Sequence, residues 1–339
     1  MNNLDENKYW EDFLKLMAIF LPHVHKSIIR LYPTISNTAV ASFAHYTSAE
    51  NVIKIMRNRN LWMRNTNCMN DFTEISHGID MIMQYLVKSS SDNGRFDLFR
   101  GLLSEVDCCH GGIATETTKQ FVGLLENISD FTYISSICEH DYSENTDGNL
   151  SMWRSYGAGT ANVAIVVNIP FYTGAAASLN IDFFPINYSN RHDFQKNIEY
   201  IKDKIIAEKE FIKQTDGELI RLFIFKMLEY CVICTKHSGF SGEKEWRGIY
   251  SPKRIRNALM IPEVQTINGT PQIIHKVPMD GDIGTPHYGL NFKNIFDRLI
   301  IGPSQFQEVM KNAFTEELKN AGIPNPEEKI FLSTIPIRT

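Results

Sequence analysis

The spacing of apolar residues changes repeatedly along this chain, and these changes limit the folds that it can adopt. Short segments with strand-like patterns gather in patches, and long stretches with apolar residues three or four positions apart separate the patches. Strands and helices do not alternate regularly, so the pattern favours an α+β fold over a doubly wound parallel sheet. The 339 residues, of which 43% are hydrophobic, are enough to bury a large core without disulfide bonds.

Long helical patterns occur in three parts of the chain. We expect an N-terminal helical extension over residues 1–38, followed by a single α+β domain over residues 39–339. Helical insertions are expected in that domain near residues 72–127 and 191–235. The strand candidates have strand-like patterns and are found at residues 41–47, 61–63, 131–138, 161–169, 183–188, 246–250, 272–277, 288–292 and 298–301.

Net charge and hydropathy limit the classes of partner that we expect and the compartment in which the protein is expected. The formal net charge is −5 without long runs of one sign, so we expect no broad basic surface for nucleic acid or anionic membranes. The longest apolar runs are far below the ~20 residues that span a bilayer. The first residues lack the pattern of a signal peptide. We therefore expect a cytoplasmic protein without a membrane partner.

The cysteines, and a group of acidic residues near His77, are of types that can bind a metal ion. The six cysteines are irregularly spaced, which favours buried thiols over a disulfide framework. Cys231 and Cys234 have zinc spacing, but a second pair is missing, so core cysteines are the favoured interpretation. Asp71, Glu74 and His77 leave a metal-dependent nuclease or hydrolase open as an alternative. We predict no metal site.

Four short motifs, well separated in the chain, carry residues suited to binding and cleaving a nucleotide. Histidine and hydroxyl groups can bond ribose hydroxyls, aromatic rings can stack on a flat ring, and a carboxylate can stabilise positive charge on a sugar. The usual phosphate-loop, dinucleotide-fold, serine-hydrolase and zinc-protease motifs do not occur. The candidate residues are His45, Tyr46 and Thr47 at a strand end, Asn70 and Asp71 in a loop, Trp153, Arg154 and Tyr156 between two strands, and Glu243, Glu245 and Arg247 at a strand start.

These motifs, in this order, resemble the bacterial domain-of-unknown-function family 2971. The likeness covers most of the chain from Ala41 onward, and the order of the motifs makes it specific. Membership of that family does not imply an activity. The resemblance rests on residues 43–48, the helix over 51–61 with the short strand after it, and residues 69–71, 152–157, 243–247 and 300–303.

A more distant resemblance implies an activity. A strand ending in His-x-Thr, a central aromatic motif and a late glutamate occur in an order similar to that of ADP-ribosyltransferases of the His-Tyr-Glu type, which include bacterial DNA-modifying toxins. The resemblance implies a split, mostly antiparallel β core that binds NAD in a cleft. It also implies the following roles: His45 holds the adenosine ribose, Thr47 supports the same strand end, Trp153 or Tyr156 stacks on nicotinamide, Glu245 bonds the nicotinamide ribose, and Glu243 orients the acceptor.

The resulting hypothesis is an ADP-ribosyltransferase with NAD as its substrate. It would transfer ADP-ribose to a nucleic-acid or protein acceptor as a toxin or phage-defence effector, and a toxin of this kind would be paired with a cognate antitoxin. An NAD glycohydrolase, with water as the acceptor, is a close variant. A non-catalytic nucleotide- or nucleic-acid-binding module stays open, because each candidate residue taken alone also has a structural explanation.

Overall fold

The computed structural model describes residues 3–33, 39–69, 73–88, 93–156, 161–170, 178–267 and 269–336. It divides the chain into two compact units. The first unit contains Met1–Arg30, Thr66–Phe131 and Phe184–Ser241, and the second contains Leu31–Asn65, Thr132–Phe183 and Gly242–Thr339. The helices expected at the N-terminus and in the two insertions thus share one unit, and most of the strands lie in the other.

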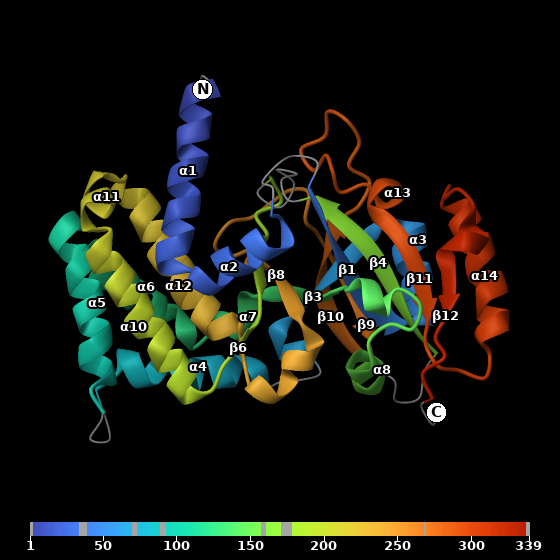
Figure 1. Ribbon diagram of the computed structural model, residues 1–339, viewed down its shortest axis with the longest axis horizontal. Coiled ribbons are helices and arrows are strands. Elements are labelled where there is room, and N and C mark those ends of the chain that lie inside the picture. The colour runs from blue at the N-terminus through green and yellow to red at the C-terminus, as the bar shows by residue number, and fades with distance from the viewer. Residues whose placement is uncertain are drawn as a thin grey trace. The chain divides into compact units, whose positions relative to one another are not determined.

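The first unit is built around one apolar helix. This helix, α12 (Gly217–Ile233), has buried side chains on all sides and packs against α1 (Asn3–Phe20), α4 (Thr73–Leu86) and α6 (Ile113–Leu125) (Figure 1). The helices of this unit are α1 (Asn3–Phe20), α2 (Pro22–Leu31), α4 (Thr73–Leu86), α5 (Arg95–His110), α6 (Ile113–Leu125), α7 (Ile128–Phe131), α10 (Arg191–Ala207), α11 (Lys209–Gln214) and α12 (Gly217–Ile233). The short 3-10 helix η1 (Thr66–Cys68) and the parallel strand pair β6 (Asn187–Tyr188) and β7 (Thr235–Lys236) complete it. A second 3-10 helix, η3 (Ser238–Glu243), begins in this unit and ends in the other.

Gly78 allows α4 and α12 to approach each other closely. A Cβ atom built on Gly78 would lie 2.0 Å from the carbonyl oxygen of Val232, a distance that no side chain can tolerate. Both contacting groups are helix backbone, so neither can rotate away. A residue without a side chain is therefore required where these two helices meet.

We expect Gly78→Ala to lower the free energy of unfolding by about 1–3 kcal/mol, because the helices must move apart. Gly123→Ala in α6 is the matched control, since a Cβ atom there would meet nothing within 4 Å. It should stabilise the protein by about 0.5–1 kcal/mol through the higher helix propensity of alanine. Urea unfolding measures both effects, and a Gly78→Ala protein as stable as the wild type would contradict the close packing.

The second unit is built on a mostly antiparallel open sheet, which confirms the mixed α and β character that the sequence predicts. The strand order is β12-β11-β4-β1-β3-β2-β10-β9, with β8 paired to β3, and β11 and β12 run parallel. The strands are β1 (Val40–Ser48), β2 (Asn60–Asn65), β3 (Tyr133–Glu139), β4 (Asn162–Pro170), β5 (Asp182–Pro185), β8 (Glu245–Tyr250), β9 (Ile261–Ile267), β10 (Thr270–Pro278), β11 (Phe296–Ile301) and β12 (Ile330–Leu332). The helices are α3 (Ala49–Asn58), α8 (Leu150–Tyr156), α13 (Phe292–Ile295) and α14 (Gln307–Asn320), with η2 (Tyr142–Glu144) and η4 (Pro326–Lys329) as 3-10 turns.

Each face of this sheet has its own core. On one side Ala44 and Tyr46 of β1 pack with Met152 and Trp153 of α8, and we call this the α8 face. On the other side, which we call the α3 face, residues of β4 and β11 pack with α3, α13 and α14. Figure 1 shows β1, β4 and β11 side by side in this sheet. Successive residues of a strand point to opposite faces, so β4 and β11 contribute to both cores.

Local signals placed most elements correctly, with one strand prediction wrong. Ser48 caps α3 as its position suggests, because its hydroxyl accepts a hydrogen bond from the Asn51 amide at 3.3 Å. The strand expected over residues 288–292 is wrong, since Asn291 caps the short helix α13 instead. The single strand expected over residues 183–188 is divided into β5 and β6, which belong to different sheets. The predictions also omitted β7, β9, β12, α7 and α14. Within the described ranges, no helix combines the length and apolar character needed to cross a membrane.

Candidate functional site

Strands β1 and β2 share one edge of β3 and separate along it. β8 pairs with Tyr133 through Cys138, so β1 and β2 both pair along the opposite edge of β3. β1 pairs there with Glu139 and Cys138, and β2 pairs with Ile134 and Tyr133. Residues 135–137 of β3 therefore face the point where β1 and β2 diverge. We call this point the fork.

His45 lies at the fork, directly after the last residue of β1 that pairs with β3. Its Nδ1 lies 3.0 Å from the carbonyl oxygen of Ser136, so the ring donates a hydrogen bond from Nδ1. Burial lowers the pKa of His45 from 6.5, and the bond to Ser136 offsets part of this effect. A neutral ring that carries its proton on Nδ1 presents Nε2 as a hydrogen-bond acceptor.

Glu245 begins β8 and forms a buried ion pair. Its Oε1 accepts hydrogen bonds from Ser136 Oγ at 2.6 Å and from Arg247 Nε at 2.8 Å. Its Oε2 lies 3.4 Å from Arg247 Nη2. Glu245 is 7% exposed and Arg247 is 1% exposed. The planar guanidinium and the serine hydroxyl together hold the carboxylate in one direction.

Ser136 joins His45 and Glu245, although these two side chains start from different faces of the sheet. Ala44 pairs with Cys138 and Cys138 pairs with Glu245, so these three residues lie on the α8 face. His45 follows Ala44 and therefore starts on the α3 face. Its ring reaches the Ser136 carbonyl at the fork, whereas the Ser136 hydroxyl meets Glu245 on the α8 face.

Ser136 is not among the site residues that the sequence predicts. The signal that could have found it is the pair Ser135 and Ser136 within the otherwise apolar run from Tyr133 to Cys138. A hydroxyl group in a strand interior needs a hydrogen-bond partner. The identity of that partner depends on the register between β3 and β8, which the sequence does not state.

Glu243 and Glu245 do not lie on one regular strand. Glu243 ends η3, Glu245 begins β8, and Lys244 between them has a positive φ of 48°. In a continuous strand, residues two apart point to the same side, and the left-handed residue breaks this rule. Lys244 forms ion pairs with Asp141 and with Glu144, the latter at 3.7 Å. Although burial lowers the pKa of Lys244, the bond to Asp141 and the charges of Glu144 and Asp141 outweigh it and raise the pKa.

Tyr46 and Trp153 belong to the core of the α8 face. Their rings meet edge to face at 4.8 Å, and Trp153 is 1% exposed. Trp153 Nε1 donates to the Asp147 carbonyl at 2.7 Å, and a Cβ atom on Gly302 would lie 3.0 Å from the indole ring. The Tyr46 hydroxyl accepts from the Asn149 amide at 2.8 Å. In this packing the Trp153 ring has no room for a second flat ring.

The remaining predicted residues have varied positions. Thr47 is half-buried, and its hydroxyl accepts from Asn51 Nδ2 at 3.0 Å, which ties the end of β1 to α3. Arg154 is exposed on α8. The backbone of Tyr156 ends α8, but its side chain lies outside the described part of the structure, as do Asn70 and Asp71.

Comparison with known proteins adds a family match. Residues 152–248 match a family described as a protein of unknown function (DUF2971). The match runs from α8 to β8 and covers less than a third of the chain, including Glu245 and Arg247 but not His45. No curated protein matches the chain, and no solved structure matches it.

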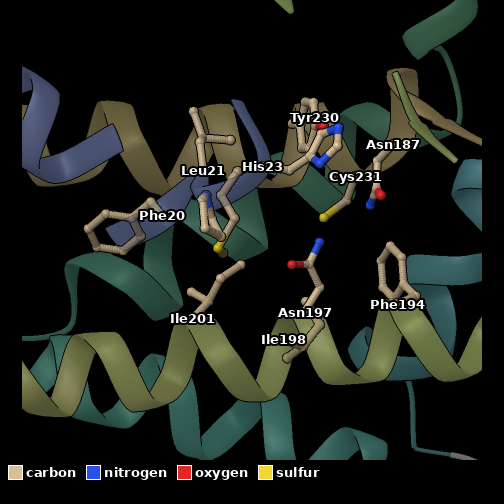
Figure 2. Close-up of a pocket in the computed structure, with 12 residues that line it drawn as sticks. Phe20, Leu21, His23, Asn187, Phe194, Asn197, Ile198, Ile201, Tyr230 and Cys231 are labelled. Carbon is tan, nitrogen blue, oxygen red and sulfur yellow. The ribbon is translucent and has the colours of Figure 1, made fainter. Parts of the chain in front are cut away.

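The first unit contains a small pocket of its own, lined mainly by apolar residues. Figure 2 shows Asn197 and Asn187 near Tyr230 and Cys231 at this pocket. The Tyr230 hydroxyl is buried and has no hydrogen-bond partner among the described residues. Burial raises the pKa of Cys231 to about 12, which keeps the thiol neutral at physiological pH. Cys231 and Cys234 are both buried, as expected for core cysteines.

Acid should destabilise the protein through His45. Its pKa is lower in the folded protein, so the unfolded chain binds the proton more readily and stability falls as pH drops below 6.5. Each unit of pKa difference is equivalent to about 1.4 kcal/mol. Thermal unfolding of His45→Asn at a series of pH values should therefore show a smaller loss in acid than the wild type. The exposed His192→Asn variant should follow the wild type, and equal acid losses in all three proteins would contradict the prediction.

Proposed function

We propose that this chain is an NAD-dependent ADP-ribosyltransferase with a fold resembling that of the His-Tyr-Glu type. It would cleave the nicotinamide glycosidic bond and transfer ADP-ribose to a nucleic-acid or protein acceptor, as a toxin or phage-defence effector. The observation that carries the proposal is that Ser136 contacts both groups: its carbonyl meets the His45 ring at the fork, and its hydroxyl meets Glu245 on the α8 face. One residue of β3 thus orients an imidazole acceptor and a carboxylate, which we assign to the two ribose groups of one dinucleotide.

His45 would bind a ribose hydroxyl. With Nδ1 donating to the Ser136 carbonyl, Nε2 of the neutral ring is the acceptor that a ribose hydroxyl can use. The low pKa keeps this acceptor available at neutral pH, because a protonated ring would have no lone pair on either nitrogen. Burial of the ring thus supports the proposed role.

Glu245 would stabilise the reacting sugar. The bond between ribose C1′ and the nicotinamide nitrogen breaks, and its electron pair leaves with neutral nicotinamide. The sugar gains positive oxocarbenium character, which the nearby carboxylate stabilises. The acceptor attacks C1′ from the opposite face, with Glu243 orienting it and receiving its proton. Of the two aromatic residues suggested for stacking, we propose Tyr156, because Trp153 is buried in the core.

One observation favours a second candidate, a non-catalytic nucleotide- or nucleic-acid-binding module. Arg247 already neutralises Glu245, and a buried ion pair of this kind also occurs as a purely structural feature. In a binding module, Glu245 would keep Arg247 satisfied and would contribute nothing to cleavage.

Glu245→Gln should reduce nicotinamide release from NAD by about 10²–10³-fold, because the charge that stabilises the reacting sugar is lost. Purified wild type and variant are compared with RNA, DNA or cell lysate as acceptor, and with water alone. Glu308→Gln, an exposed residue on α14, is the matched control and should keep full activity.

Folding and chemistry must be separated in this experiment, because Glu245→Gln leaves Arg247 without its carboxylate. Calorimetric NAD binding and thermal unfolding are therefore measured on the same samples. A folded variant that binds NAD and retains turnover would overturn the assignment. NAD binding without any release in the wild type would instead favour the binding module.

Ser136→Ala should lower nicotinamide release by about tenfold, because the carboxylate loses one of the two short bonds that orient it. Ser136→Thr keeps a hydroxyl group and should recover part of the activity. Ser135→Ala is the matched control, since the neighbouring residue points to the other face of the sheet. Equal losses in Ser135→Ala and Ser136→Ala would argue against a role for the Glu245 contact.

A further inference from the structure

Lys244 has a backbone conformation that an L-residue adopts only at a cost. Its φ of 48° lies in the left-handed region, which residues with a Cβ atom rarely adopt. Such strain persists only where the surrounding contacts hold it, and it is found most often at functional sites. Lys244 lies between Glu243 and Glu245 in the chain, so the contacts that hold Lys244 also fix the backbone that joins these two residues.

Two segments of the second unit hold Lys244 in this conformation, the end of β3 and the turn that follows it. Its carbonyl accepts a hydrogen bond from the Glu139 amide at 3.0 Å, which fixes the backbone against the end of β3. Its Nζ forms ion pairs with Asp141 and Glu144 on the turn that follows β3. We call Lys244, Asp141 and Glu144 the lysine clasp.

Asn149 connects this clasp to the residues around Glu243. Its Nδ2 donates to Glu144 Oε1 at 3.0 Å and to the Gly242 carbonyl at 3.4 Å. Its backbone amide donates to the Tyr46 hydroxyl at 2.8 Å, which ties the turn to β1. Both sides of Glu243, at Gly242 and at Lys244, are therefore bonded to the same turn.

The geometry points to Lys244 as a positioning residue that sets the direction of Glu243 relative to Glu245. This inference rests on the proposed function and extends it to the choice of acceptor. Glu245 is fixed by Ser136 and Arg247, so it serves cleavage whatever the acceptor is. Glu243 lies before β8, separated from it by the left-handed residue Lys244. The direction of the Glu243 side chain decides how well an acceptor other than water is held for attack on C1′. The clasp therefore controls the ratio of ADP-ribose transferred to nicotinamide released.

The test measures that ratio in Lys244 variants, with nicotinamide release and labelled ADP-ribose incorporation recorded in the same reaction. Lys244→Ala removes the ion pairs and keeps the cost of positive φ, so the ratio should fall on the order of tenfold. Lys244→Arg keeps the charge and should keep the ratio near the wild-type value. Asn325→Ala is the matched control, because Asn325 has a φ of 47° in the same unit outside the clasp. It should leave the ratio unchanged.

A double-variant comparison shows whether Lys244 acts through Glu243. In a Glu243→Gln background, Lys244→Ala should cause no further fall in the ratio, because the group that it positions is already gone. A full additional fall in that background would overturn the inference. So would a wild-type ratio in Lys244→Ala, or an equal change in Asn325→Ala.

The experiments distinguish a failure of the proposed function from a failure of the inference about Lys244. If the wild type releases no nicotinamide, the proposed chemistry is wrong, and thermal unfolding still tests the clasp. Lys244→Gly relieves the positive φ, and Lys244→Ala does not, so the glycine variant should have the higher Tm. Equal Tm values in these two variants would show that Lys244 is not held in the left-handed region.

Discussion

The way in which β3 shares its hydrogen bonds governs the arrangement of the second unit. β8 occupies one edge of β3, while β1 and β2 divide the other, which leaves residues 135–137 between them. A backbone carbonyl there requires another partner, and the His45 ring supplies it for Ser136. Had β1 continued along β3, a strand amide would occupy that place. The position of the candidate histidine is thus a consequence of the divergence of the sheet.

The buried ion pair of β8 depends on the same strand. Ser136 carries the hydroxyl that bonds Glu245, and the pairing of β3 with β8 places Arg247 directly opposite Ser136. A buried ion pair costs desolvation energy, so its contribution to stability is small. The ion pair orients the carboxylate instead, because Oε1 accepts from both the Arg247 guanidinium and the Ser136 hydroxyl, and Oε2 accepts from the same guanidinium. Orientation is what a group acting on a developing charge requires.

Local sequence patterns predicted some features of the structure correctly and failed at others. Ser48 was identifiable as a helix cap because capping depends on neighbours within four residues. The helical spacing of Trp153 is compatible with stacking on a ligand and equally with a place in the core. Contacts with Tyr46 and Gly302, each more than 100 residues away along the chain, place it in the core. The strand expected over residues 288–292 was wrong because a short apolar run does not distinguish a strand from a turn that leads into a helix.

The sequence by itself determined the mixture of helices and strands, the apolar helix α12 and the cap at Ser48, because these follow from periodicity and nearest-neighbour chemistry. The sequence also indicated His45 and Glu245 as candidate site residues, but it did not show how the two are connected in space. Only the tertiary structure decided that Ser136 contacts both, that Arg247 is paired with Glu245, and that Lys244 separates Glu243 from the strand. The two contacts of Ser136 depend on the register between strands about 90 to 110 residues apart, as the separations of the bonded residues show, and register is set by packing of the whole sheet.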